Sequence, residues 1–91
     1  MWEVYEHRRV SKQLNALPIE ILKRYEKWKD IVSISGPQGS RQIKGLHDET
    51  LRREWKSHRS SRLNQQCRVI YRIERDIVLV VSVTPQDYRT K

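Results

Sequence analysis

Apolar residues follow two different periods along the chain, and each period predicts a secondary structure. Residues 2–5 place Trp and Val against Glu and Tyr in alternation, which predicts a short strand. Val10, Leu14 and Leu17 then recur at the spacing of one helical face, so we expect a helix over residues 7–17. The chain is therefore expected to begin with a strand followed by a helix.

A second amphipathic helix is expected over residues 18–35, where apolar side chains repeat at three-to-four spacing. The proline at its first position is favourable, because the N–H that proline lacks has no intrahelical partner there anyway. Gly36 and Pro37 end the helix. Two consecutive helices with apolar stripes need a sheet to cover them, and Tyr25 and Trp28 are interpreted as core residues of that contact.

Three strands are expected after a turn-rich loop at residues 36–45, and they run over residues 56–63, 67–74 and 77–83. The last strand is apolar at nearly every position, which predicts cover on both faces and a central place in the sheet. The predicted fold class is α+β, with residues 1–91 as one domain. An N-terminal strand and a three-stranded antiparallel segment complete one sheet, and the helical hairpin packs on one face of it.

The charge of the chain indicates which class of partner it binds. The chain has 19 lysine and arginine residues against 11 acidic ones, a net charge of +8 and an isoelectric point near 10.1. Residues 44–72 hold eight basic and three acidic residues, which gives +5 of that excess. This concentration favours a nucleic acid or ribonucleoprotein partner through phosphate neutralisation, although a well-solvated basic face has the same composition.

The cysteine, the histidines and the apolar stretches indicate the cellular compartment and whether a metal site is present. Cys67 has no second cysteine to pair with, so it is interpreted as a small buried hydrophobe in a reducing compartment. No apolar stretch is long enough to span a membrane, and the N-terminus lacks the apolar region of a signal peptide. We therefore expect a soluble cytoplasmic protein. His7, His47, His58 and Cys67 lack zinc-site spacing, and no metal or other cofactor is expected.

Basic residues on the predicted strands suit a phosphate ligand, because guanidinium groups on a rigid sheet keep a fixed spacing. Arg62 and Arg68 are the candidates to stabilise the charge that develops when a 2′-hydroxyl attacks phosphorus without a metal. His58 and Tyr88 are candidates for proton transfer, although a single surface histidine is more often inert and Tyr88 fits a tail residue packed on the sheet equally well. The remaining basic candidates, for RNA binding, are Lys44, Arg52, Arg53, Lys56 and Arg59.

The string R-L-N-x-Q-x-R-V-I-Y, from Arg62 to Tyr71, precedes an apolar strand that is followed by T-P-Q-D-Y-R. Together with the order strand, helix, helix, three strands and tail, it resembles the RelE/ParE superfamily of toxin–antitoxin toxins, in particular the RelE- and HigB-like branch. The resemblance covers almost the whole chain. It implies a small α+β toxin that enters the ribosomal A site and cleaves messenger RNA, and an antitoxin that neutralises it by wrapping the same surface.

The resemblance also implies roles for single residues. Arg68 would be the arginine that stabilises the phosphate, Arg62 its neighbour on the strand before, and Tyr88 the aromatic residue of the tail. His58, like Lys56, falls near positions where relatives carry basic groups. Many relatives have a histidine two residues before the tail tyrosine, whereas this chain has a glutamine, Gln86, whose amide cannot transfer protons.

Two other functions stay open. A ParE-like inhibitor of DNA gyrase needs no catalytic basic cluster on the sheet, and the density of cations from Lys56 to Arg68 argues against it. An RNA-binding module without catalysis is the other, and the lack of RNP or KH signatures argues mildly against that.

Overall fold

The computed structural model describes residues 2–85, and its elements follow the expected order. The helices are α1 (Arg8–Asn15), α2 (Ile19–Ser35) and α3 (Pro37–Gln42). The strands are β1 (Glu3–Glu6), β2 (Glu49–Thr50), β3 (Arg59–Asn64), β4 (Cys67–Glu74) and β5 (Ile77–Pro85). Short 3-10 turns at Lys44–Leu46 and Arg53–Trp55 lie on either side of β2.

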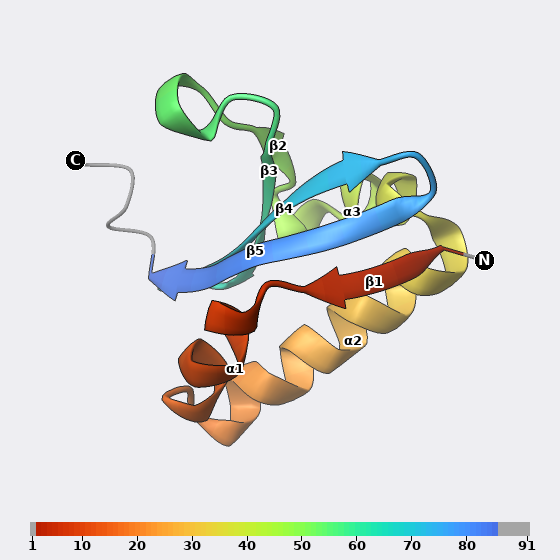
Figure 1. Ribbon diagram of the computed structural model, residues 1–91. Coiled ribbons are helices and arrows are strands. Elements are labelled where there is room, and N and C mark those ends of the chain that lie inside the picture. Colours follow the sequence, from red (N-terminus) through yellow and green to blue (C-terminus); the bar gives the residue numbers. More distant parts are fainter. Residues whose placement is uncertain (1, 86–91) are drawn as a thin grey trace.

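The strands form one mixed sheet in the order β1-β5-β4-β3-β2 (Figure 1). β1 runs parallel to β5, and the other neighbouring pairs are antiparallel. The predicted α+β class is therefore confirmed. β5 lies inside the sheet, between β1 and β4, as its apolar sequence predicts. Cover on both faces is incomplete, because Leu79 and Val81 remain partly exposed while Val78 and Val80 are buried.

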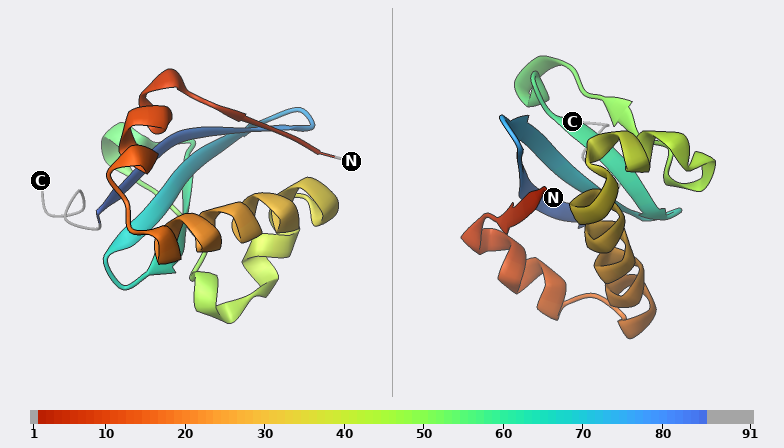
Figure 2. Two further views of the ribbon diagram at one scale, coloured as in Figure 1. Left: turned by 90° about the horizontal axis from the view of Figure 1, so that it is seen from below. Right: turned by 90° about the vertical axis from the view of Figure 1, so that its right-hand side faces the viewer.

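α1 and α2 lie on the same side of the sheet, as the views in Figure 1 and Figure 2 agree. α2 contacts both β1 and β3, so it spans most of this face. Tyr25 and Trp28 project from α2 into the core, where they stack with ring centroids 6.1 Å apart. Trp28 also packs on Tyr71 of β4, at 5.3 Å. The two aromatic residues are core residues, as their helical spacing predicts.

Gly36 separates α2 from α3 and has a conformation that side chains disfavour. Its φ is +74°, and a Cβ built on it would lie 2.6 Å from the indole of Trp2. Its N–H closes α2 by donating to the carbonyl of Val32, at 2.8 Å. Pro37 then starts α3 at the position where a proline is favoured. The segment predicted as a loop thus contains a short helix and a 3-10 turn.

β3 begins at Arg59, three residues later than predicted. The reason is local: residues 53–55 form a 3-10 turn, and Ser57 has φ +73°, which ends any extended run before it. β2, which was not predicted, pairs with the start of β3. Within residues 2–85, no helix is long and apolar enough to cross a membrane.

Candidate nucleic-acid interface

Arg62 and Arg68 are directly opposite each other on β3 and β4. Opposed residues of an antiparallel pair put their side chains on the same face. The next pair, Ser61 and Val69, points to the other face, where Val69 belongs to the core under α2. Neighbouring strands therefore present these two arginines together, on the face away from the helices.

The two arginines differ in exposure. Arg62 is half-buried, whereas Arg68 has an exposed fraction of 0%. The guanidinium of Arg68 donates from Nε to Oγ of Ser60 at 2.9 Å and from Nη2 to the carbonyl of His47 at 2.7 Å. Glu49 lies 3.9 Å from it. Arg68, a predicted phosphate ligand, is therefore not accessible on this face, because the chain just before β2 lies against its guanidinium.

Arg59 is also held by partners within the protein, although its side chain is 21% exposed. Its Nε donates to Oδ1 of Asp48 at 2.7 Å, and its Nη1 donates to Oγ1 of Thr50 at 2.8 Å. Burial lowers the pKa of Arg59, but the hydrogen bond and charge of Asp48 outweigh it and raise the pKa above the ordinary arginine value. In this conformation Arg59 therefore serves a buried ion pair, which leaves little of its charge for an RNA phosphate.

Asp48 is the acceptor at the centre of a hydrogen-bond network, and its side chain is fully buried. Besides Arg59, it accepts from the hydroxyls of Ser40 at 3.1 Å and Ser61 at 2.6 Å, and from the hydroxyl of Tyr71. Burial, followed by the hydrogen bond to Asp48, raises the pKa of Tyr71 to about 12. These bonds join α3, the chain before β2, β3 and β4, and they fix the segment that covers Arg68.

The tip of the β2–β3 hairpin, residues 51–58, rises away from the rest of the sheet (Figure 1). Its backbone is held by bonds from the N–H of Leu51 to the carbonyl of His58 and from the N–H of His58 to the carbonyl of Trp55, both 3.0 Å. Arg53 and Ser57 have positive φ values of 60° and 73°. The exposed cations of this tip are Arg52, Arg53 and Lys56. They form a compact basic tip, and Lys44 adds an exposed cation just before β2.

His58 is half-buried at the base of this tip. Its ring meets Trp55 edge-on, with centroids 5.4 Å apart, and its Nδ1 lies 3.1 Å from the carbonyl of Lys56. A strand over residues 56–63 would put His58 and Arg62 on one face, but β3 begins after His58, so the two do not share a strand face. A proton-transfer role for His58 would have to act from the hairpin tip.

No family model and no curated protein matches the sequence. Solved structures match it over most of its length. A chain of the archaeal RelE–RelB complex from Pyrococcus horikoshii has a TM-score of 0.74 at 21% identity, covering 93% of this chain and 94% of that one. A chain of the RelBE2 toxin–antitoxin complex from Mycobacterium tuberculosis has 0.71 at 22%, covering 93% and 98%. YafQ from E. coli has 0.71 at 14%, with full coverage of both chains. The chain has the RelE-like fold.

The RelE-like fold leaves the activity to be argued from the site, because one fold carries many functions. Of the predicted catalytic residues, this structure brings Arg62 and Arg68 together and places His58 on the hairpin tip. Tyr88 lies outside the described residues, as does Gln86. The role of Tyr88 stays a prediction.

The sequence analysis missed the acidic residues of this candidate interface. Asp48 and Glu49 fall between the predicted loop and the first predicted strand and were assigned no role, yet they contact Arg59 and Arg68. The available signal was composition: they make up two of the three acids within residues 44–72, where basic residues dominate. An acid that becomes buried against such a background is expected to pair with a neighbouring arginine.

Proposed function

We propose that this chain is the toxin of a type II toxin–antitoxin system and cleaves messenger RNA in the ribosomal A site. The observation that carries the proposal is the RelE-like fold with Arg62 and Arg68 opposed on neighbouring strands. Paired cations on a rigid sheet are suited to phosphate, because their spacing does not change when the ligand arrives. The net charge of +8 supports an RNA partner in the same way.

The reaction is attack of a ribose 2′-hydroxyl on the adjacent phosphorus, with loss of the 5′-oxygen and formation of a cyclic phosphate or, after hydrolysis, a 3′-phosphate. Negative charge builds on the phosphoryl oxygens in the transition state. Arg62 is the cation placed to touch these oxygens, because it is partly exposed. Arg68 lies directly opposite and contributes a fixed charge from below the surface. Tyr88 or His58 moves the protons.

RNA binding is assigned to the exposed cations beside this pair. The basic tip of the hairpin, with Arg52, Arg53 and Lys56, projects from the sheet edge and can reach phosphates of a neighbouring RNA strand. Lys44 is exposed near the base of the same hairpin. Arg59 contributes less than its sequence position predicts, because Asp48 holds it.

The partner of this toxin would be a cognate antitoxin, and the site of action the cytoplasm. Solved proteins of this fold include complexes named YoeB–YefM, from Staphylococcus aureus, and RelE–RelB, from Pyrococcus horikoshii. We propose a hetero-oligomeric complex with an antitoxin for this chain as well.

The test is Arg62→Ala in cells in which the chain is induced, with primer extension on ribosome-bound message. Losing a preorganised donor to a charged transition state costs roughly a hundredfold in rate. Arg72→Ala is the matched control, since Arg72 is an exposed arginine on β4 paired with Glu74 at 2.9 Å. It stands four residues beyond Arg68, about 13 Å along the strand. Cleavage that survives in Arg62→Ala, or that falls equally in both variants, contradicts the proposed site.

The second candidate is a protein that inhibits DNA gyrase by binding it. Burial of Arg68 favours this alternative. Only Arg62 of the opposed pair is partly exposed, whereas two accessible arginines would hold a scissile phosphate better. Supercoiling assays with purified protein separate the two functions. Inhibition of gyrase without cleavage of ribosome-bound message would select the alternative.

A further inference from the structure

One tryptophan lies outside the core of this protein. Trp28 belongs to the core under α2, and Trp2 packs against that core. Within residues 2–85, the core and the side chains packed on it do not include Trp55, which ends the 3-10 turn of the basic tip and is half-buried there. A large ring on a projecting tip adds little to the main core, so its place there needs another explanation.

The neighbours of this ring along the chain are mostly cations. Arg52, Arg53 and Lys56 are exposed, and Glu54 is the one acid in the sequence of residues 51–58. Three basic residues and one acid give the tip a net charge of +2 with its histidine neutral. An aromatic ring among cations is the combination by which proteins hold single-stranded nucleic acid, because the cations bind phosphates and a base stacks on the ring. A tip with cations alone would supply only the first of these contacts.

The ring of Trp55 is braced by the residue at the base of the tip. The imidazole of His58 meets it edge-on, with ring centroids 5.4 Å apart. The backbone N–H of His58 donates to the carbonyl of Trp55 at 3.0 Å, and its Nδ1 lies 3.1 Å from the carbonyl of Lys56. A ring that is already ordered loses less entropy when a base stacks on it, so binding is stronger.

The backbone of the tip is held in an unusual conformation. Arg53 and Ser57 have φ values of 60° and 73°, and they are two of the four non-glycine residues with positive φ within residues 2–85. Such a conformation is unfavourable and persists only where the surrounding structure holds it, typically at ligand-binding segments. At the base of the tip, Arg59 donates to Asp48 at 2.7 Å and to Thr50 at 2.8 Å. The tip is therefore a preformed projection of the sheet.

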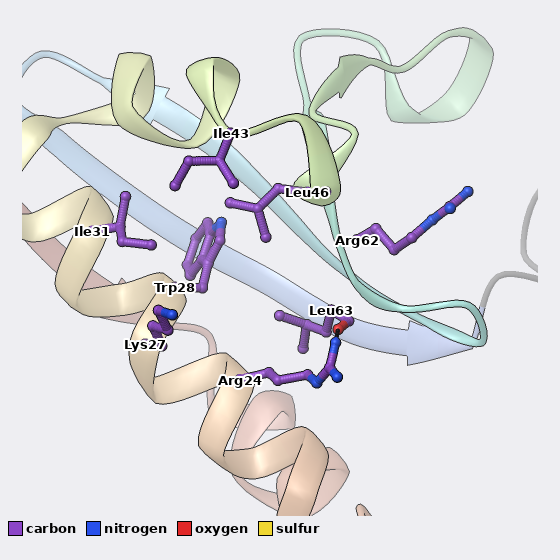
Figure 3. A pocket seen from close by; sticks show the side chains of 9 residues that line it. Arg24, Lys27, Trp28, Ile31, Ile43, Leu46, Arg62 and Leu63 are labelled. Carbon is purple, nitrogen blue, oxygen red and sulfur yellow. Dashed lines mark hydrogen bonds between the residues drawn. The ribbon is translucent and has the colours of Figure 1, made fainter.

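The basic tip continues directly into β3, the strand that carries Arg62. His58 precedes this strand, and Arg62 lies four residues further along, about 13 Å in an extended chain. Figure 3 shows the side chain of Arg62 extended, with its guanidinium directed away from α2. One short single strand of RNA is long enough to contact both the tip and this cation.

We propose that Trp55 is a stacking platform for an unpaired RNA base, with Arg53 and Lys56 on the phosphates beside that base. The inference rests on the proposed function for RNA as the ligand, and it adds recognition of a base away from the opposed pair of arginines. Stacking accepts every base, because each has a π-face, but it requires a base that is not paired. The cations alone would also suit an acidic protein segment, whereas the ring among them favours a nucleic-acid base.

The first experiment measures binding of a single-stranded 2′-O-methyl oligoadenylate 12-mer to the purified chain by fluorescence anisotropy. The blocked 2′-oxygen prevents cleavage, so binding is measured without reaction. Trp55→Leu keeps an apolar side chain without an aromatic face, and it is expected to weaken binding roughly fivefold to a hundredfold. Trp55→Phe keeps a smaller face and should lose less. Tyr5→Leu is the matched control, with no expected loss, because Tyr5 is an aromatic residue 51% exposed on β1, at the opposite edge of the sheet from β2.

The salt dependence of binding separates stacking from charge. Lys56→Ala removes one phosphate contact, so the slope of log K against log salt is expected to become shallower by about 0.7. Trp55→Leu should lower the affinity and leave this slope unchanged, since a stacked base releases no counterion. A Trp55→Leu variant whose slope changes as in Lys56→Ala would show that the ring merely supports the cations, and it would overturn the platform.

The outcomes distinguish this inference from the proposed function. Equal affinity of wild type and Trp55→Leu removes the platform, while loss of message cleavage in Arg62→Ala would still support the nuclease. Affinity that depends on Trp55, together with normal cleavage by Arg62→Ala, removes the nuclease site and leaves the platform. No binding of the 12-mer by wild type overturns the platform and leaves the tip to a protein partner.

A crosslinking experiment identifies the source of the base. Ultraviolet irradiation of the chain bound to ribosomes joins stacked aromatic side chains to bases, and primer extension stops at the joined nucleotide. A stop in the message that disappears in Trp55→Leu assigns the platform to the substrate strand. A stop in ribosomal RNA that disappears in this variant assigns it to docking on the ribosome. Stops that all persist in Trp55→Leu would contradict stacking on Trp55.

Discussion

Replacing Asp48 is expected to lower the free energy of unfolding strongly, even when the new side chain has the same shape. Asp48→Asn keeps the shape of the side chain and removes its charge. In the native protein the carboxylate accepts from Arg59 through Oδ1, and from the hydroxyls of Ser40, Ser61 and Tyr71 through Oδ2. An amide has one acceptor oxygen, so it must turn its NH₂ group either towards the guanidinium or towards the three hydroxyls.

The magnitude follows from the burial of both partners. Breaking a buried ion pair by neutralising one member costs about 3–5 kcal/mol, because the other charge stays in place without compensation. The side chain of Asp48 is fully buried, whereas that of Arg59 is 21% exposed and can recruit water, so we expect the lower end, about 3 kcal/mol. For a domain of this size that corresponds to a fall in melting temperature of roughly 12–24 °C.

Thermal and urea unfolding followed by circular dichroism measure this change. Glu74→Gln is the control, since Glu74 is exposed and paired with Arg72 at the surface, where an ion pair contributes about 0–1 kcal/mol. Tyr71→Phe should cost less when Asp48 is already Asn, because the two changes remove the same hydrogen bond. A loss in Asp48→Asn no larger than in Glu74→Gln would refute the view that this network holds the chain before β2.

Three further predictions concern backbone, pH and the buried arginine. Gly36→Ala is expected to cost of order 1–3 kcal/mol or more, because φ is +74° and Trp2 fills the space, while Gly45→Ala, with nothing within 4 Å, should be near neutral in the same unfolding assay. Burial raises the pKa of Cys67 to about 11 and that of Tyr71 to about 12, from 9.0 and 10.0. The folded state then holds these two protons more tightly, so the stability that they contribute should be full below pH 9 and be lost between pH 9 and 12; a urea midpoint constant from pH 9 to 12 would contradict this. Arg68→Lys keeps the charge but loses the planar guanidinium, which donates from both Nε and Nη2. A fall in the urea midpoint worth about 1–3 kcal/mol is therefore expected. An unchanged midpoint would show that the hydrogen bonds of Arg68 do not stabilise the fold.

The sequence by itself determined the elements and their order. Val10 and Leu14 set one face of α1, and Gly36 with Pro37 set the end of α2, because helical periodicity and backbone restrictions act over a few residues. The bounds of β4 were also predicted from its pattern and its flanking turns. These are local properties, and the printed chain contains them in full.

The register of β3 against β4 was partly contained in the sequence too. A short polar turn joins the two strands, and Oδ1 of Asn64 accepts from the N–H of Gln66 to close it. A short turn fixes which residues are opposed, so Arg62 and Arg68 could be expected on neighbouring strands with their side chains on one face.

The tertiary structure alone decided which charges are accessible. Alternation along β4 assigns Arg68 to a face of the sheet but says nothing of what lies on that face, and the chain around His47 and Glu49 covers it. The pairing of Arg59 with Asp48 likewise joins residues eleven positions apart through a hairpin whose shape depends on its contacts. Periodicity reports direction, whereas burial is the sum of long-range contacts. For that reason a strand of cations could be predicted from this sequence, and the one partly exposed arginine of the opposed pair, Arg62, could not.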